Sequence, residues 1–277
     1  MTDKKKDILR VIIFIVLANL PMFIGGILFE SESKAYSFIA YIAAYSPAIA
    51  HIITRIITKD KSPMYLRINF KGNRKYYLMG IVYAIIISVC EVLIFLSEYD
   101  IPLNFGKKEF AFLMFLTAAG IVGFYIYIGE EFGWRAYLTP KLESLMPEPV
   151  ALIVSGIVWG MWHAVPIMNG LNFGKGYRGE PYTGFLVMCL SCIFYGCTLT
   201  YLTKKTKSIY PASICHSCID TIRILSVMAG NNPEFLEVYQ KNNFKLCVLS
   251  MIPDMLIGAV FFVILTYEYI SNRKKKA

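Results

Sequence analysis

Apolar runs of about 20 residues recur along the whole chain, and each run is long enough to cross the hydrocarbon core of a bilayer. The runs are continuous and do not alternate, which favours transmembrane helices over the strands of a β-barrel. Charged residues make up only 17% of the 277 residues, whereas hydrophobic residues make up 56%. A soluble domain of this length would carry a larger charged fraction. The sequence therefore predicts an all-α, polytopic transmembrane helical bundle.

We expect about eight spans, which form a single membrane domain over residues 1–277. No internal repeat and no low-complexity linker divides the chain. The expected spans cover residues 8–29, 36–57, 76–96, 110–137, 150–168, 182–203, 208–229 and 244–270.

Basic residues are distributed unequally between the two sets of loops that eight spans would produce. One set holds 18 Lys and Arg and comprises both termini, the loop at 59–75, Lys141 and the loop at 204–207; the opposite set holds seven. Cytoplasmic loops carry the excess of Lys and Arg, so we expect both termini in the cytoplasm. The net charge of +9 is explained by this orientation and does not point to nucleic acid.

The seven cysteines fall mostly inside apolar spans. Two pairs have Cys-x-x-Cys spacing, Cys189 with Cys192 and Cys215 with Cys218, which raises the alternative of a zinc knuckle. The sixth and seventh expected spans run antiparallel, which separates the two pairs by about 10 Å in depth. We therefore expect free thiols that act as small packing residues.

Two adjacent carboxylates, Glu130 and Glu131, follow an apolar run in the fourth expected span. Glu131 and Arg135 stand four apart on one helix face, in the order that favours an ion pair. Glu130 is rotated by about 100° from its neighbour, so it points elsewhere and has no local cation. A charged residue inside a membrane is costly and is a functional candidate by default. The alternative is a helix end at the membrane interface that carries charges.

Two further polar clusters lie on other expected spans. His163 follows Trp159 by one helical turn, and His216 precedes Asp220 by one turn. A lone histidine in a membrane is commonly a helix–helix hydrogen bonder, but two histidines with a carboxylate pair on a third span indicate a catalytic site. The remaining charged or histidine residues inside spans are expected to be paired, solvated or structural: His51, Glu91, Arg223 and Asp254.

The three clusters resemble the three motifs of the CAAX-protease and bacteriocin-processing (CPBP, or Abi) family of intramembrane endopeptidases. GEEFGWRAYL matches the Glu-Glu-x-x-x-Arg motif, WGMWH matches Phe-x-x-x-His, and HSCID matches His-x-x-x-Asn/Asp. The motifs occur in the family's order on separate expected spans. The resemblance implies a family-like catalytic core at about residues 110–229.

The resemblance also implies a role for each matching residue. Glu130 is similar to the catalytic glutamate that activates a water, and Glu131 with Arg135 is similar to the supporting pair. His163 is similar to the residue that holds this water or shuttles its proton, with Trp159 in the place of the family's Phe. Tryptophan keeps the aromatic character but adds bulk and an N–H.

By the same resemblance, His216 and Asp220 are similar to the residues that stabilise the tetrahedral intermediate. At the last position of this motif the chain has an aspartate and not an asparagine. An ionised aspartate cannot donate a hydrogen bond to an oxyanion. We therefore expect Asp220 to orient His216, and a protonated Asp220 that contacts the oxyanion is the alternative.

The same residues raise the alternative of a zinc site, because histidines and carboxylates are also zinc ligands. In a zinc-dependent version of the protease, the ligands would be Glu130, His163 and His216. The chain contains no His-Glu-x-x-His motif, and a glutamate-activated water needs no metal. We expect no cofactor.

The leading hypothesis is therefore an intramembrane endopeptidase that hydrolyses a membrane-associated peptide or protein from the cytoplasmic side. Prenylated CAAX termini, bacteriocin leaders and signalling peptides are all compatible substrates. The alternatives are a non-enzymatic bacteriocin-immunity or accessory membrane protein, and a proton or ion transporter, although the internal repeats common in transporters are not evident. The expected location is the cell membrane of a bacterium, with the lipid bilayer as partner and the oligomeric state open.

Overall fold

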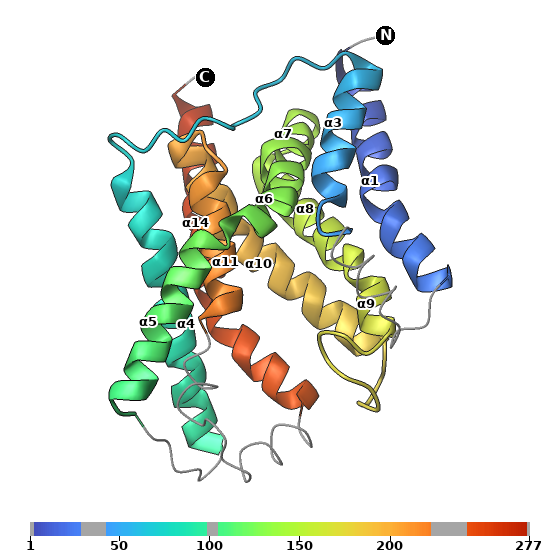
Figure 1. Ribbon diagram of the computed structural model, residues 1–277. Coiled ribbons are helices and arrows are strands. Elements are labelled where there is room, and N and C mark those ends of the chain that lie inside the picture. The colour runs from blue at the N-terminus through green and yellow to red at the C-terminus, as the bar shows by residue number, and fades with distance from the viewer. Residues whose placement is uncertain (1–2, 29–42, 99–104, 223–242, 276–277) are drawn as a thin grey trace.

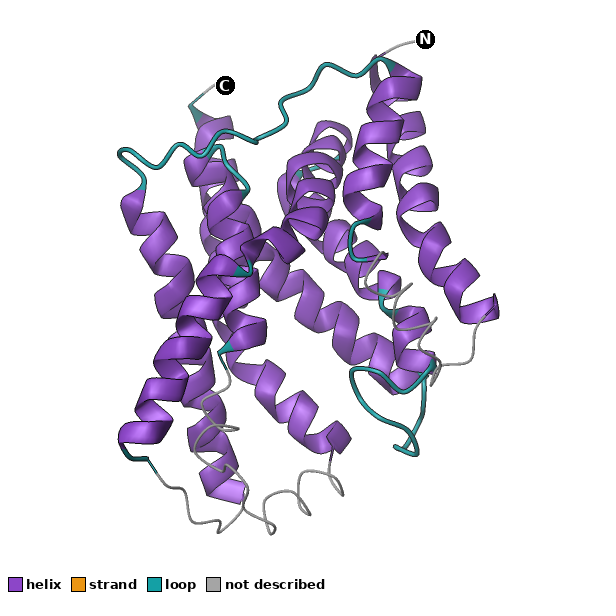
Figure 2. Cartoon of the chain, in the orientation of Figure 1, coloured by secondary structure: helices purple, strands orange, loops and turns teal. Residues whose placement is uncertain are grey.

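The computed structural model describes residues 3–28, 43–98, 105–222 and 243–275. Within these ranges the chain is helical and contains no β-strand, as Figure 2 shows. The prediction of an all-α fold is confirmed for this part of the chain. The helices are α1 (Asp3–Leu28), α3 (Ser46–Thr58), α4 (Arg74–Glu98), α5 (Lys107–Val122), α6 (Phe124–Gly133), the π-helix η1 (Trp134–Leu138), α7 (Thr139–Leu145), α8 (Glu148–Trp162), α9 (Ala164–Met168), α10 (Tyr182–Thr206), α11 (Tyr210–Thr221) and α14 (Asn243–Lys274).

Four helices are long and apolar enough to cross a membrane, namely α1, α4, α10 and α14. A fifth span results if the bent pair formed by α5 and the segment Phe124–Leu145 is counted as one. Large apolar side chains face outward on these helices: Ile12 is 54% exposed, Leu93 61% and Val263 64%. An extended apolar exterior suits contact with lipid, so the chain is an integral, multi-pass membrane protein.

The other three expected spans correspond to shorter helices. The described part of the second span is α3, with 13 residues, and that of the seventh is α11, with 12 residues. The fifth corresponds to α8 and α9, with 15 and 5 residues. The expected start of the second span and the expected end of the seventh, including Arg223, lie outside the described residues. The count of eight spans stays a prediction.

The fourth expected span is broken, so the expectation of one continuous helix at 110–137 is wrong. α5 ends at Val122, α6 begins at Phe124, and the two segments are bent by 42°. Gly123 lies at the break, where a Cβ atom would stand 2.9 Å from the hydroxyl oxygen of Ser217 on α11. The absence of a side chain therefore lets α11 approach the bend closely.

The helix changes character again directly after the glutamate pair. η1 continues α6 with the wider turn of a π-helix, and the Thr139 hydroxyl donates to the Trp134 carbonyl at 3.0 Å. Short π-helical segments are frequent at functional sites. Here the segment carries Arg135, which the sequence pairs with Glu131.

α3 packs tightly against the face of α6 that contains two glycines. Gly129 and Gly133 are four apart and share one helix face. A Cβ on Gly133 would overlap the backbone of Pro47, so only glycine allows this approach. Next to this contact, His51 is fully buried and its Nδ1 lies 2.8 Å from the Phe132 carbonyl oxygen. His51 is therefore structural, as expected.

The elements that carry the polar motifs meet in the middle of the bundle. α10 packs against α8, α14 and α11, and α11 also packs against α4, α5 and α6. Figure 1 shows both chain ends at the same end of the bundle, together with the long connection between α3 and α4. The two chain ends and this connection all belong to the set of loops that is rich in Lys and Arg. The side of the membrane on which they lie stays a prediction.

Candidate active site

Glu131 is the centre of a buried ionic cluster. Its side chain is fully buried, and its Oε2 lies 3.2 Å from Nε of Arg135, one turn along the chain. The ion pair expected from the i, i+4 spacing is confirmed, although its alignment is not that of a hydrogen bond. The other oxygen, Oε1, lies 2.8 Å from Nδ1 of His216 on α11. Glu131 therefore supports both a cation on its own segment and a histidine from another helix.

Glu130 points away from this ion pair, as the helical geometry predicts. It is 8% exposed, and its Oε2 accepts a hydrogen bond of 2.9 Å from the indole Nε1 of Trp159 on α8. None of the ion pairs in the described ranges includes Glu130. The hydrogen bond that it receives from a described side chain comes from a neutral donor, so no cation within these ranges is dedicated to its negative charge.

Trp159 connects the two glutamates. The guanidinium carbon of Arg135 lies 4.1 Å from the centre of the Trp159 ring, a cation–π contact that fixes both side chains. The N–H that tryptophan adds relative to the Phe of the resembled motif is the group that holds Glu130. The departure at this position thus provides a specific contact.

His163 lies at the junction of α8 and α9. Pro166 has no backbone N–H for the carbonyl of Trp162, four residues earlier, so one hydrogen bond of a continuous helix is lost at this point. The Nδ1 of His163 lies 3.0 Å from the Trp159 carbonyl oxygen. Because a carbonyl only accepts, Nδ1 carries the proton, and Nε2 of the neutral ring is left to accept a hydrogen bond.

His216 is oriented by a different residue from the one that we expect from the sequence. Its Nδ1 donates to Glu131, 85 residues earlier in the chain, and Asp220 does not make this contact. The orienting contact expected of Asp220 is therefore made by Glu131 at Nδ1. Asp220 remains beside His216 as an exposed residue on the same helix turn.

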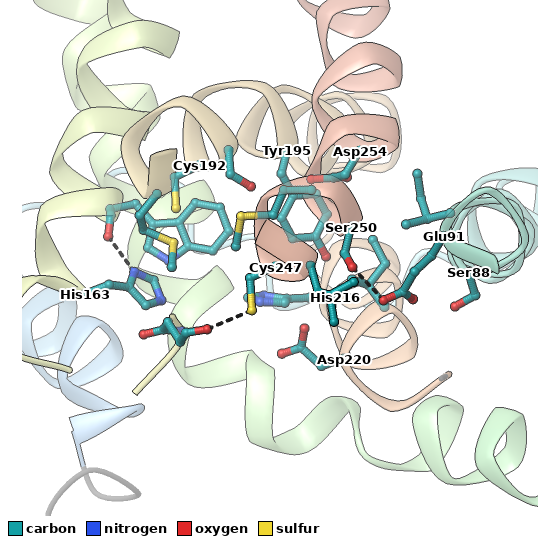
Figure 3. A pocket seen from close by; sticks show the side chains of 18 residues that line it. Ser88, Glu91, His163, Cys192, Tyr195, His216, Asp220, Cys247, Ser250 and Asp254 are labelled. Carbon is teal, nitrogen blue, oxygen red and sulfur yellow. Dashed lines mark hydrogen bonds between the residues drawn. The ribbon is translucent and has the colours of Figure 1, made fainter. Parts of the chain in front are cut away.

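A cavity of about 450 Å³ adjoins these side chains. His163, His216, Trp159 and Asp220 line it, as Figure 3 shows for the two histidines and the aspartate. Glu130 is not part of the wall but is one hydrogen bond removed from it, through Trp159. Of the expected catalytic residues, three therefore face the cavity and the fourth lies directly behind its wall.

Two more carboxylates line the cavity from α4 and α14. Glu91 accepts a hydrogen bond of 2.7 Å from the Ser250 hydroxyl, and Asp254 accepts one from the Tyr83 hydroxyl. Both are paired, in agreement with the expectation from sequence. Their place in the cavity wall was not predictable, because α4 and α14 carry no recognisable motif.

The described residues contain no group of three His, Cys, Asp or Glu side chains arranged as metal ligands. Glu130, His163 and His216 each contact a protein atom instead: the Trp159 indole, the Trp159 carbonyl and the Glu131 carboxylate. All seven cysteines are free thiols, and Cys192, Cys215 and Cys218 are buried, as expected for packing residues. The metal-free mechanism stays a prediction.

Residues 109–222 match the model of a protein family described as type II CAAX prenyl endopeptidase, Rce1-like. No curated protein matches the chain. The matched segment contains Glu130, His163, His216 and Asp220. The resemblance to CAAX proteases is thus confirmed, and the match supports a protease, a hydrolase embedded in the membrane, without deciding its catalytic type.

Proposed function

We propose that this membrane protein, whose residues 109–222 match the type II CAAX prenyl endopeptidases, is an intramembrane endopeptidase in which Glu130 activates a water. The observation that carries the proposal is that the two glutamates have different contact partners. Glu131 is bound by Arg135 and His216, whereas among the described residues the side chain that holds Glu130 is a neutral indole. A positioned carboxylate without a neutralising cation is suited to accept a proton.

In the first step, Glu130 accepts a proton from the water while the water oxygen attacks the carbonyl carbon of the scissile peptide bond. The free Nε2 of His163 is placed to accept a hydrogen bond from this water and so to orient it. The π electrons of the carbonyl move to its oxygen, which becomes an oxyanion. The proton then passes to the amide nitrogen, the C–N bond breaks, and a carboxylate and an amine leave.

His216, which also lines the cavity, stabilises the oxyanion in this proposal. Its Nδ1 proton is committed to Glu131, so only the doubly protonated ring has a second N–H, at Nε2, to donate. The adjacent Glu131 carboxylate supports this cationic form. Fixed donors of this kind stabilise charge that develops in the transition state.

The membrane orientation belongs to the same proposal. Eight spans with both termini in the cytoplasm of a bacterium account for the excess of Lys and Arg in the terminal set of loops. The partners are then the bilayer and a membrane-associated peptide or protein, with no nucleic acid. A glutamate mechanism needs no zinc.

The test is cleavage of a fluorescence-quenched peptide that carries a farnesylated cysteine followed by three residues. The purified protein in detergent should release the three-residue end, and Glu130→Gln should not. The assay extends to native substrates when the termini of membrane-associated peptides are compared between cells with the wild-type protein and cells with the Glu130→Gln protein. If neither experiment distinguishes the two proteins, the alternative of a non-enzymatic immunity or accessory protein is favoured.

A further inference from the structure

The oxyanion of the proposed reaction requires donors, and the third motif does not supply one from its last residue. Asp220 is a carboxylate and accepts hydrogen bonds when ionised. The other donors around the cavity include groups that are already committed. The Trp159 indole donates to Glu130, and the Ser250 hydroxyl donates to Glu91.

Tyr195 on α10 is differently placed. It lines the cavity and is 7% exposed, and its hydroxyl has no hydrogen-bond partner among the described residues beyond the weakly interacting thiol of Cys215. Figure 3 shows its side chain directed into the space that His216 and Asp220 adjoin. The hydroxyl oxygen is buried, and buried hydroxyl groups are normally paired, so this group has hydrogen-bonding capacity left for an atom that reaches it from the cavity.

The Tyr195 ring is fixed by contacts with the catalytic side chains. Its centre lies 5.4 Å from that of His216 in an edge-to-face arrangement, and 5.8 Å from the Trp159 ring. On its other side it is parallel to Tyr83 at 6.5 Å. A donor on a long helix, locked by three rings, is preorganised in the way that oxyanion stabilisation requires.

We propose that Tyr195 is a further catalytic residue, which donates its hydroxyl hydrogen bond to the oxyanion of the tetrahedral intermediate. This role rests on the proposed function of the same site. A tyrosine hydroxyl is an established type of oxyanion donor in enzymes. In this chain it complements His216 and takes over the donor function that Asp220 lacks.

The test compares Tyr195→Phe with a matched control, Tyr177→Phe. Tyr177 also has a buried hydroxyl without a hydrogen-bond partner among the described residues, but it lies outside the cavity wall and stacks on Phe244. Both variants lose one oxygen atom and keep the ring. The probe is the farnesylated, fluorescence-quenched peptide, with kcat, KM and thermal unfolding in detergent measured for each protein.

Tyr195→Phe should lower kcat by about 10²- to 10³-fold, the usual effect of removing one oxyanion donor, with KM and the unfolding temperature nearly unchanged. Tyr177→Phe should leave kcat unchanged. As a second measurement, a peptide trifluoromethyl ketone, which forms a hydrate that resembles the tetrahedral intermediate, should bind Tyr195→Phe more weakly by a similar factor. The unreactive amide peptide should bind both proteins equally.

The outcomes separate the two proposals. An active wild-type protein and an equally active Tyr195→Phe would overturn the role of Tyr195 alone. The kcat of Tyr195→Phe could also fall together with an equal fall in the kcat of Tyr177→Phe, or with a lower unfolding temperature. Either result would show a packing effect and would also overturn the role of Tyr195. A wild-type protein as inactive as Glu130→Gln would contradict the proposed function, and the role of Tyr195 with it.

Discussion

Two buried ionic clusters in this molecule have similar composition but distribute their contacts between opposite charges differently. The central cluster consists of Glu130, Glu131, Arg135 and His216. The terminal cluster, at the end of the bundle where both chain ends lie, consists of Asp7, Arg10, Asp60 and Lys141.

In the terminal cluster every charge has an opposite partner. Lys141 lies 2.8 Å from Asp60 and 3.2 Å from Asp7, and Arg10 lies 2.8 Å from Asp7 and 3.6 Å from Asp60. The cluster joins α1, the loop after α3 and α7. Two acids and two bases balance, and no group is left for chemistry.

The central cluster also contains two acids and two bases, but both bases contact the same carboxylate. Glu131 contacts both Arg135 and His216, whereas within the described part of the chain Glu130 has the Trp159 indole as its side-chain partner. Burial of charges alone therefore does not identify a reaction site. An ionisable group that its surroundings position without neutralising is the more specific indication.

The largest effect on stability is expected at the central cluster. Arg135→Met should lower the free energy of unfolding by about 3–5 kcal/mol, because it leaves the carboxylate of Glu131 buried without its cation. Thermal unfolding in detergent and the folded yield measure this change. A variant with wild-type stability would show that Arg135 does not stabilise the fold through Glu131.

A smaller loss is expected when the terminal cluster is broken. Lys141→Met removes contacts to both Asp60 and Asp7 but leaves Arg10 in place, so the loss should be about 1.5–3 kcal/mol, the range for a hydrogen bond to a charged group. Cleavage per folded molecule should be unchanged. A fall in kcat at full stability would contradict the structural assignment of this cluster.

The sequence was sufficient for the parts of the site that depend on local geometry. The spacing of Glu131 and Arg135 predicted their ion pair and the separate direction of Glu130. The apolar runs predicted the helical membrane fold. These features depend on residues within one or two helical turns of each other.

Contacts between distant segments could not be predicted in this way. The Glu131 contact that orients His216 depends on the bend at Gly123, where α11 approaches α6. Likewise, Tyr195 belongs to no motif, and its place in the cavity follows only from the packing of α10. Pro166 was a visible signal for the break beside His163, since proline cannot continue a helix without losing a hydrogen bond.

The pH dependence of stability provides a further test of the terminal cluster. Burial opposes the charge of Asp60, but hydrogen bonds from Lys141 and the Ser62 N–H, with the positive charges of Lys141 and Arg10, outweigh it and lower the pKa of Asp60 to about 2. The folded state therefore favours ionised Asp60. Its contribution is complete above the unfolded pKa of about 4 and is lost as the pH falls through about 2.

This contribution should be at most about 2.5 kcal/mol, from a shift of less than two pKa units. Asp60→Asn should be less stable than the wild type at neutral pH, and the difference should shrink between about pH 4 and pH 2. Unfolding midpoints measured in detergent over this range test the prediction. A difference that stays constant with pH would show that the charge of Asp60 is not the source.

The smallest effect is expected from removal of metal. If no metal takes part, exhaustive chelation followed by buffer exchange should leave the cleavage rate unchanged. Metal analysis of the purified protein provides an independent measurement. One tightly bound zinc per chain, with activity lost on chelation and regained with zinc, would recast Glu130, His163 and His216 as ligands.

The central claim is that one glutamate serves the reaction and its neighbour serves the fold. The most direct measurement compares Glu130→Gln and Glu131→Gln for cleavage per folded molecule and for thermal unfolding. We predict that Glu130→Gln abolishes cleavage with an unfolding temperature near that of the wild type, and that Glu131→Gln lowers the unfolding temperature and the folded yield. An active Glu130→Gln, together with a stable but inactive Glu131→Gln, would show that the two roles are reversed.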